Sequence, residues 1–213
     1  MAGYAQRIIR PPRTLTEQEQ TALLKAAGEH ARGFRDHVLL SVALGTGLRE
    51  HELLALSVGD VFHEDGNPRR RFPLPAYKGK GRASAAGQPT PPPHQEAIVP
   101  DDAHYKLRKF YAWKRIRGEP LAADAPLFLS RFNKRLSPRR FRSLFREWQT
   151  LAGFERTFTV HELRHTALTR LWQRTKDLRM VQRMARHSSA KTTEIYTHVN
   201  DDDFLAQMRK QPC

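Results

Sequence analysis

Helix-start signals recur along this chain, and they constrain its fold more than any other feature. Thr16 with Glu19, and Thr159 with Glu162, have the spacing of capping boxes, in which two side chains satisfy the first free N–H groups of a helix. Residues 137–138 are a serine N-cap followed by a proline at the first helical position. We therefore expect helices over residues 16–31, 34–44, 49–56, 101–117, 137–153, from 159, over 177–186, from 189 through the tyrosine at 196, and from about 201.

The stretch between the third and fourth of these helices has strand character. Short strands are predicted at 61–62, 71–77 and 97–99. Between the last two, residues 78–95 hold three glycines and four prolines, which excludes regular structure and predicts a long hairpin tip. The expected fold is mainly α with a small three-stranded antiparallel β-sheet, an α+β class in which about 78–95 is an insertion.

The chain is strongly basic. Among its 213 residues, Lys and Arg total 37 and Asp and Glu total 22, which gives a net charge of +15. Such an excess favours a polyanionic partner, and double-stranded DNA is the partner we expect.

Cysteine usage and hydropathy exclude several classes of protein. Cys213 is the single cysteine, so the chain has neither an internal disulfide framework nor a cysteine-rich zinc module. The longest apolar run, 38–44, is too short to cross a bilayer, and the basic N-terminus lacks the apolar stretch of a signal peptide. We expect a cytoplasmic protein with no membrane partner.

Arginines, histidines and a tyrosine stand in motifs that can cleave a phosphodiester without a metal ion. Arg49 and Arg164 are candidates to bind the non-bridging oxygens, because guanidinium is always charged and donates two parallel hydrogen bonds. Tyr196 is the candidate nucleophile, since a phenol can attack phosphorus when a base removes its proton. His161 lies three residues before Arg164, so both point the same way near a helix start, where backbone N–H groups also favour an anion.

Three motifs in this order resemble the signatures of the tyrosine recombinase, or phage integrase, family over roughly residues 15–210. They are Gly45-Thr-Gly-Leu-Arg49-x-x-Glu52-Leu, His161-x-x-Arg164-His165-Thr and His187-Ser-Ser-x-x-Thr-Thr-x-x-Tyr196-Thr-His. The resemblance implies a site-specific DNA recombinase that cleaves a strand through a covalent 3′-phosphotyrosine and rejoins it to a partner strand, in DNA integration or excision. It also implies that no metal and no cofactor is used, and that the enzyme is nucleoid-associated in a prokaryote, a phage or a mobile element.

The resemblance carries the family's catalytic roles over to single positions. Arg49 and Arg164 would clamp the phosphate, His187 would hydrogen-bond it, and Tyr196 would attack it. His161 would be a general base or a proton relay.

Other positions have supporting or alternative roles. The family's general acid is a lysine in a strand-turn-strand hairpin, which Lys80 matches, with Lys78 as the alternative. Glu52 matches an acidic position that orients the first arginine, and His165 is a further supporting residue. Arg186 stands where the family usually has glycine, which leaves two interpretations open: crowding of the site, or an added phosphate contact.

The expected domain organisation is a basic arm at 1–14 followed by a catalytic domain at 15–213, without the family's N-terminal core-binding domain. The chain is then either a catalytic fragment or a minimal recombinase, and we expect its DNA binding to be weak and strongly salt-dependent. An apolar stripe at Phe204, Leu205 and Met208 fits a tail that docks in a neighbouring protomer, giving a homotetramer on DNA, or one that packs on its own domain.

Three other interpretations fit parts of the sequence. Residues 161–165 also read H-E-x-x-H, the zinc-binding pattern of metallopeptidases, although Arg164 would put a cation among the ligands. A type IB topoisomerase would share the chemistry. A catalytically decayed DNA-binding protein would share the fold.

Overall fold

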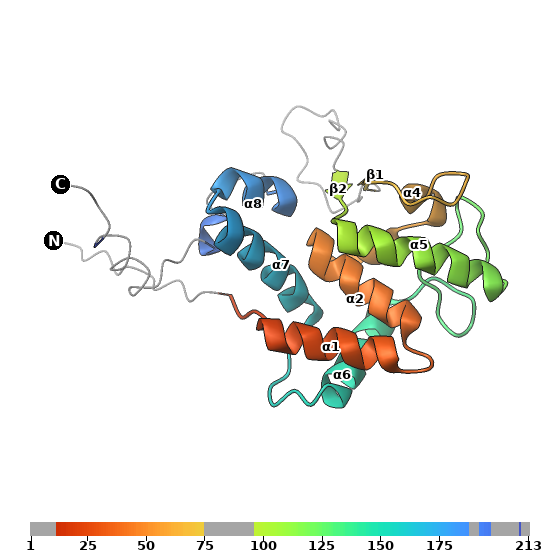
Figure 1. The fold of residues 1–213 in the computed structure, drawn as a ribbon, viewed down its shortest axis with the longest axis horizontal. Helices are drawn as coiled ribbons and strands as arrows, with labels where there is room; N and C mark the ends of the chain where they lie inside the picture. The colour runs from red at the N-terminus through yellow and green to blue at the C-terminus, as the bar shows by residue number, and fades with distance from the viewer. Residues whose placement is uncertain (1–11, 75–95, 188–191, 197–208, 210–213) are drawn as a thin grey trace, which may run out of the picture.

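The computed structural model of this protein describes residues 12–74, 96–187, 192–196 and 209. Helices make up most of the described chain, as predicted (Figure 1). The elements in chain order are α1 (Glu17–Glu29), α2 (Phe34–Thr46), α3 (Glu50–Ala55), α4 (Val58–Val61), β1 (Arg71–Pro73), β2 (Glu96–Ile98), α5 (Asp101–Ile116), α6 (Pro138–Leu151), α7 (Val160–Thr175), α8 (Leu178–Ala185) and the 3₁₀ helix η2 (Glu194–Tyr196).

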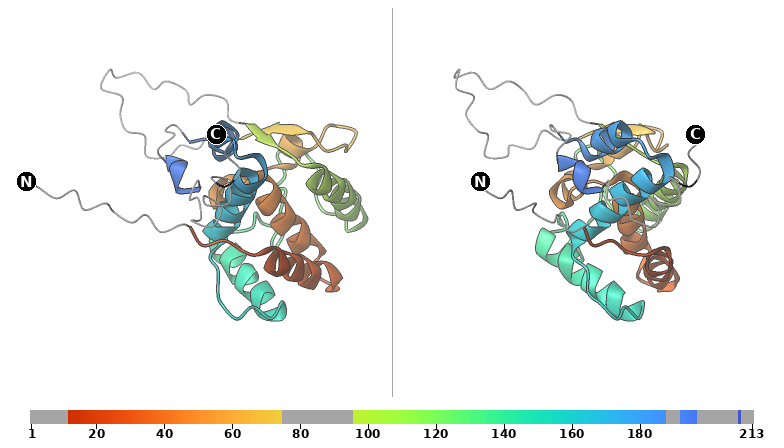
Figure 2. Two further views of the ribbon diagram at one scale, coloured as in Figure 1. Left: turned by 60° about the vertical axis from the view of Figure 1, so that its left-hand side comes forward. Right: turned by 90° about the vertical axis from the view of Figure 1, so that its left-hand side faces the viewer.

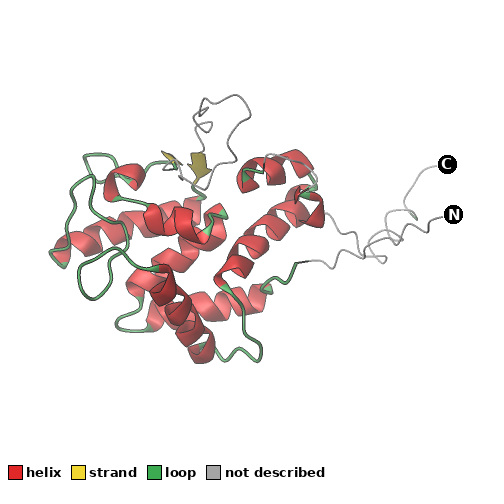
Figure 3. Ribbon diagram, turned by 180° about the vertical axis from the view of Figure 1, so that it is seen from behind, coloured by secondary structure: helices red, strands yellow, loops and turns green. Residues whose placement is uncertain are grey.

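Helix α2 lies at the centre of the fold. It is apolar around most of its circumference, and Val38, Leu39, Leu40 and Val42 are each at most 1% exposed. A helix of this kind is stable only when neighbours cover it, and α1, α5 and α7 all pack against it (Figures 1 and 3). The core therefore fixes α7, which carries much of the candidate site, relative to α2.

The predicted helix starts are confirmed at α1, α6, α7 and α8. Thr16 and Thr159 form capping boxes with the glutamates three residues later. Ser137 accepts a hydrogen bond from a backbone N–H of the first turn of α6, and Asp177 accepts two from the first turn of α8. Each such cap contributes about 1 kcal/mol to helix stability.

The sheet has two strands among the described residues, and not the three that were predicted. β1 and β2 are antiparallel, with Phe72 opposite Ala97 and both side chains buried. Residues 75–77 of the expected second strand, and the insertion at 78–95, lie outside the described residues.

The strand predicted at 61–62 is wrong. Val61 is the last residue of α4, and Phe62 forms only an isolated bridge with Pro68. The physical reason lies four residues earlier, where the Ser57 N–H donates to the Asp60 carboxylate at 2.8 Å in a capping box that starts a helical turn.

A second, smaller apolar cluster joins the C-terminal elements. It buries Leu168 of α7, Val181 and Ala185 of α8, and Tyr196 of η2. Both α8 and η2 contact α7, beside which they are seen in Figure 2. The expected short helix before Tyr196 is a 3₁₀ turn where it is described, while its expected cap at 189 and the last helix expected from 201 lie outside the described residues.

The helices are short. The longest among the described residues, α5 and α7, have 16 residues each. In this part of the chain none has the length and apolar character to cross a lipid bilayer.

Candidate active site

Arg49 lies where the chain turns out of α2 into α3. Gly47 ends α2 in the left-handed conformation, with φ of 61°, which glycine adopts without steric cost. Arg49 is then the N-cap of α3, and the Glu52 carboxylate accepts both its backbone N–H, at 2.7 Å, and its Nη1, at 2.8 Å. These two hydrogen bonds fix the direction of the Arg49 guanidinium.

Arg164, on α7, is buried and bridges the ends of two other helices. Its Nη1 donates to the carbonyl of Gly47 at 2.6 Å, and its Nη2 donates to the carbonyl of Ala185, the last residue of α8. Carbonyls at helix ends lack an intrahelical partner, so one guanidinium satisfies both and ties α2 to α8. Burial, with the charges of Arg49 and Arg186, lowers the pKa of Arg164 to about 10, which leaves it cationic at neutral pH.

Arg186 brings a third guanidinium to the site. It is the C-cap of α8, with φ of 54°, a conformation uncommon for residues other than glycine. Its side chain is 5% exposed, its Nη2 lies 2.6 Å from Glu52 Oε2, and its Nη1 donates to the Met184 carbonyl at 2.9 Å. Its Nε is buried and has no hydrogen-bond partner in the part of the chain that the structure describes. The ion pair with Glu52 was not predicted from the sequence.

Two of these arginines therefore share one carboxylate. Burial alone would raise the pKa of Glu52, but the charge of Arg186 and the hydrogen bonds from Arg49 hold that pKa below its usual value. With Arg164 beside them, three guanidinium groups stand against one carboxylate in this network, an excess of two positive charges. A partly buried excess of this sign attracts an anion.

His187 follows α8 directly and lies next to Arg164. Its Nδ1 is 3.1 Å from the hydroxyl of Thr193, and its Nε2 is 3.4 Å from Arg164 Nη2. Burial and the neighbouring guanidiniums lower the pKa of His187 to about 4, so the ring is neutral at pH 7. Thr193 is fully buried and was missed as a site residue; its spacing of three before Tyr196 was the signal available.

Tyr196 is buried among these groups. The residue is 5% exposed, and its hydroxyl oxygen lies 2.8 Å from His165 Nδ1. Burial raises the pKa of Tyr196, while the charges of Arg164 and Arg49 oppose that rise. The phenol is therefore protonated at neutral pH and needs a base to become a strong nucleophile.

His161 and His165 stand on successive turns of α7. Their ring centroids are 4.4 Å apart, edge to face, and His161 is exposed whereas His165 is partly buried. Burial, followed by the charges of Arg164 and Arg49, lowers the pKa of His161. Burial, followed by His161 and Arg164, lowers the pKa of His165 to about 4. His165 is therefore neutral at pH 7.

The structure thus brings together most of the residues predicted for the site. The predicted residues that it gathers are Arg49, Glu52, His161, Arg164, His165, His187 and Tyr196, to which it adds Arg186 and Thr193. The two candidate general acids, Lys78 and Lys80, lie outside the described residues.

The segment that reads H-E-x-x-H does not present the ligand set of a metallopeptidase. A carboxylate oxygen of Glu162 accepts the backbone N–H of Thr159, and the other lies 3.7 Å from Arg13 Nε. Within the described ranges, no three His, Cys, Asp or Glu side chains come together in a way that could hold a metal ion.

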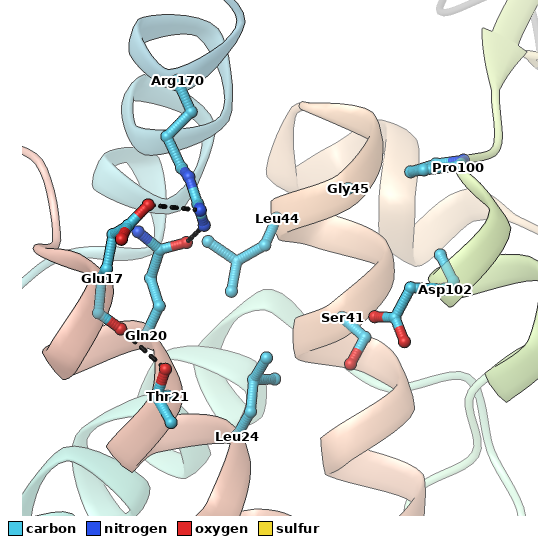
Figure 4. Close-up of a pocket in the computed structure, with 11 residues that line it drawn as sticks. Glu17, Gln20, Thr21, Leu24, Ser41, Leu44, Gly45, Pro100, Asp102 and Arg170 are labelled. Carbon is cyan, nitrogen blue, oxygen red and sulfur yellow. Dashed lines mark hydrogen bonds and ion pairs between the residues drawn. The ribbon is translucent and has the colours of Figure 1, made fainter. Parts of the chain in front are cut away.

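A separate pocket lies between α1, α2, α5 and α7 (Figure 4). It has a volume of about 310 Å³, and at one side Arg170 of α7 donates to Gln20 and Glu17 of α1. None of the predicted site residues lines it. The candidate active site is therefore distinct from this pocket.

Sequence comparison places the chain among known proteins. The profile of the phage integrase family matches residues 13–203. Tyrosine recombinase XerC of Haemophilus ducreyi is 30% identical over 197 residues, which are 92% of this chain and 58% of that protein. XerC of Chlamydia muridarum is 31% identical over 191 residues, 89% of this chain and 55% of that protein. The chain thus spans less than two thirds of the length of these relatives.

Structure comparison gives the same family. The XerA recombinase matches with a TM-score of 0.72 and 25% identity, over 96% of this chain and 67% of that one. XerH bound to its palindromic difH substrate, at 21% identity, shares the fold with a TM-score of 0.72, over 99% of this chain and 57% of that one. The catalytic domain of bacteriophage HP1 integrase shares the fold at 14% identity, with a TM-score of 0.58, over 94% and 96% of the two chains. This chain therefore belongs to the phage integrase, or tyrosine recombinase, family.

Proposed function

We propose that this chain is a site-specific DNA recombinase that cleaves and rejoins strands through a phosphotyrosine at Tyr196. One observation carries the proposal: His187 contacts both Arg164 and the Tyr196 ring, Glu52 holds Arg49 and Arg186 together, and the charges of Arg164 and Arg49 act on the Tyr196 phenol. The segments involved are up to 147 residues apart, from position 49 to position 196.

The arginines and His187 would bind the scissile phosphate. Arg49 and Arg164 would donate to its non-bridging oxygens, whose negative charge grows in the pentacoordinate transition state, and His187 would donate a further hydrogen bond. Removal of one such donor typically lowers the rate about 10²–10³-fold.

Tyr196 would then attack phosphorus in line with the bond to the 5′-oxygen. The new bond joins the tyrosine oxygen to the 3′-phosphate, the bond from phosphorus to the 5′-oxygen breaks, and a general acid protonates the leaving oxygen. Lys80 is the acid we propose, with Lys78 as the alternative. Attack of a partner strand's 5′-hydroxyl on the phosphotyrosine reverses these steps and rejoins the DNA, so no bond energy is lost.

Double-stranded DNA is the proposed partner, and the net charge of +15 supports it. Among proteins of the same fold, XerH is described bound to difH substrate and the Tn1549 transposon integrase in complex with circular intermediate DNA. We propose a homotetramer on DNA, assembled by exchange of C-terminal tails, and action in the cytoplasm on a mobile element, with resolution of joined chromosomes as the second setting.

The test is covalent capture of DNA by the 213-residue chain. A library of nicked suicide duplexes with randomised arms is incubated with the protein, and adducts that survive denaturant are isolated and sequenced. We expect an adduct in the wild-type protein and none in Tyr196→Phe, which keeps the ring and removes only the hydroxyl. An adduct that persists in Tyr196→Phe overturns the proposal. Relaxation of a supercoiled plasmid that lacks the selected sequence would instead indicate a topoisomerase.

A further inference from the structure

We propose that His165 is a catalytic residue, the group that takes the proton from the Tyr196 hydroxyl as it attacks DNA. This role presupposes the proposed strand cleavage. It differs from the role carried over from the family, in which His161 would be the general base or a proton relay.

The first support is the position of the two histidines. His165 Nδ1 lies 2.8 Å from the Tyr196 hydroxyl oxygen, whereas His161 is one turn of α7 farther toward the helix start and is exposed. In the tautomer that carries its proton on Nε2, Nδ1 of His165 has a free lone pair and accepts the hydrogen bond from the hydroxyl. A general base must be within about 2.6–3.2 Å of the proton's heavy atom, and His165 meets that condition.

The second support is the charge of the surroundings. The groups that face His165 are His161, Arg164 and Glu162 on its own helix, His187 from the end of α8, and Tyr196 itself. Burial and most of these neighbours hold the pKa of His165 at about 4, against about 6.5 for a free histidine. Nδ1 is therefore unprotonated throughout the neutral pH range and is available as an acceptor.

Each proton and electron pair in the proposed cleavage step is accounted for. As the tyrosine oxygen bonds to phosphorus, its proton moves to His165 Nδ1, and the broken bond's electrons stay on the 5′-oxygen, which takes a proton from the general acid. The incoming phosphate carries negative charge into a site with two positive charges in excess, which favours the imidazolium that forms. The exposed ring of His161 lies beside that of His165, with the two ring centroids 4.4 Å apart. On rejoining, His165 returns the proton to the tyrosine oxygen.

The decisive variant is His165→Asn, with His161→Asn as the matched control. The Asn side-chain oxygen lies near the place of Nδ1 and can still accept the hydrogen bond, but it cannot hold a proton at neutral pH. The single-turnover rate of adduct formation is measured from pH 6 to 9 on the duplex selected above. Fluorescence anisotropy on the same duplex and thermal unfolding check that binding and folding are kept.

We expect His165→Asn to be at least about 10²-fold slower than wild type at pH 7. That ratio should shrink about tenfold per pH unit as the phenolate form of Tyr196 becomes populated, because attack then needs no base. For His161→Asn, the ratio of the wild-type rate to the variant rate should not change with pH. For His165→Ala, added imidazole should restore part of the rate.

Three outcomes would overturn the assignment. A pH-independent ratio for His165→Asn would make it a positioning residue, and a pH-dependent ratio for His161→Asn would return the role to His161. Nitrogen-15 NMR showing Nδ1 of His165 protonated at pH 7 in the free protein would also contradict it, whatever the DNA result. Absence of any wild-type adduct would overturn the proposed function, and this role with it.

Discussion

Glu52 is the residue on which two of the three guanidinium groups of the site depend. Its carboxylate accepts from Arg49 at 2.8 Å and pairs with Arg186 at 2.6 Å, and its side chain is 7% exposed. A buried carboxylate in such a network cannot be neutralised without leaving its cationic partners uncompensated.

We predict that Glu52→Gln lowers the free energy of unfolding by about 3 kcal/mol, because the buried charge of Arg186 loses its partner. The same change should slow adduct formation, since Arg49 is no longer held in direction. Urea denaturation measures the first effect. Glu50→Gln is the control: it lies on the same helix but pairs with the largely exposed Arg142, and such pairs contribute at most about 1 kcal/mol. Equal losses in both variants would contradict the prediction.

At the scale of single residues, the motifs predicted which side chains come together at the candidate site, but not all of their contacts. Arg49, Arg164, His187 and Tyr196 could be predicted because each stands in a recognisable motif. The direction of Arg186 could not, because a long side chain in a left-handed backbone position takes its direction from tertiary neighbours. The i, i+4 spacing of the two α7 histidines put them on one face, but which of them meets the tyrosine depends on how η2 folds back onto α7.

Helix ends, more than helix interiors, position the site. Arg49 caps α3, Arg164 binds the carbonyl that ends α2, and Arg186 and His187 follow the end of α8. Among these helix ends, the one at Gly47 tolerates a side chain least. The φ of Gly47 is 61°, and an added Cβ would lie 3.2 Å from Met184 Cε.

We predict that Gly47→Ala destabilises the fold by about 1–2 kcal/mol and slows adduct formation by more than that loss explains. The backbone strain at position 47 would displace the carbonyl that accepts the hydrogen bond from Arg164. Gly153→Ala is the matched control, because Gly153 has φ of 73°, has open space around a Cβ, and follows α6. It should show a similar loss of stability with an unchanged cleavage rate. Equal slowing of cleavage in both variants would contradict a specific effect of Gly47 on Arg164.

An element could be predicted from the sequence when the residues that cause it lie close together in the chain. The starts of four helices, α1, α6, α7 and α8, could be predicted because a capping interaction involves residues within four positions of one another. The strand at 61–62 was wrong because a two-residue apolar run carries no period, and the Ser57 and Asp60 cap decided the outcome. The left-handed ends at Arg186 and Lys176 carry no local signal, since neither is glycine or asparagine.

At the scale of the whole molecule, the net charge should control the proposed binding to DNA. A protein that neutralises about six phosphates loses about 10³-fold in affinity between 50 and 200 mM salt. With a net charge of +15, we predict a loss of at least that size for this chain, measured by fluorescence anisotropy. Thermal unfolding over the same salt range is the control. Affinity that stays within tenfold while the protein stays folded would contradict a phosphate-dominated interface.

Tyr196 belongs to the second apolar cluster, with Leu168 and Val181, through the ring that carries its hydroxyl. Loss of the hydroxyl leaves that cluster packed, whereas loss of the ring would open a void costing about 3–5 kcal/mol. A descendant without the proposed strand cleavage would still be selected to keep an aromatic side chain there. In distant homologues, therefore, an aromatic residue at this position is a weak guide to surviving activity, and the histidine facing it is a better one.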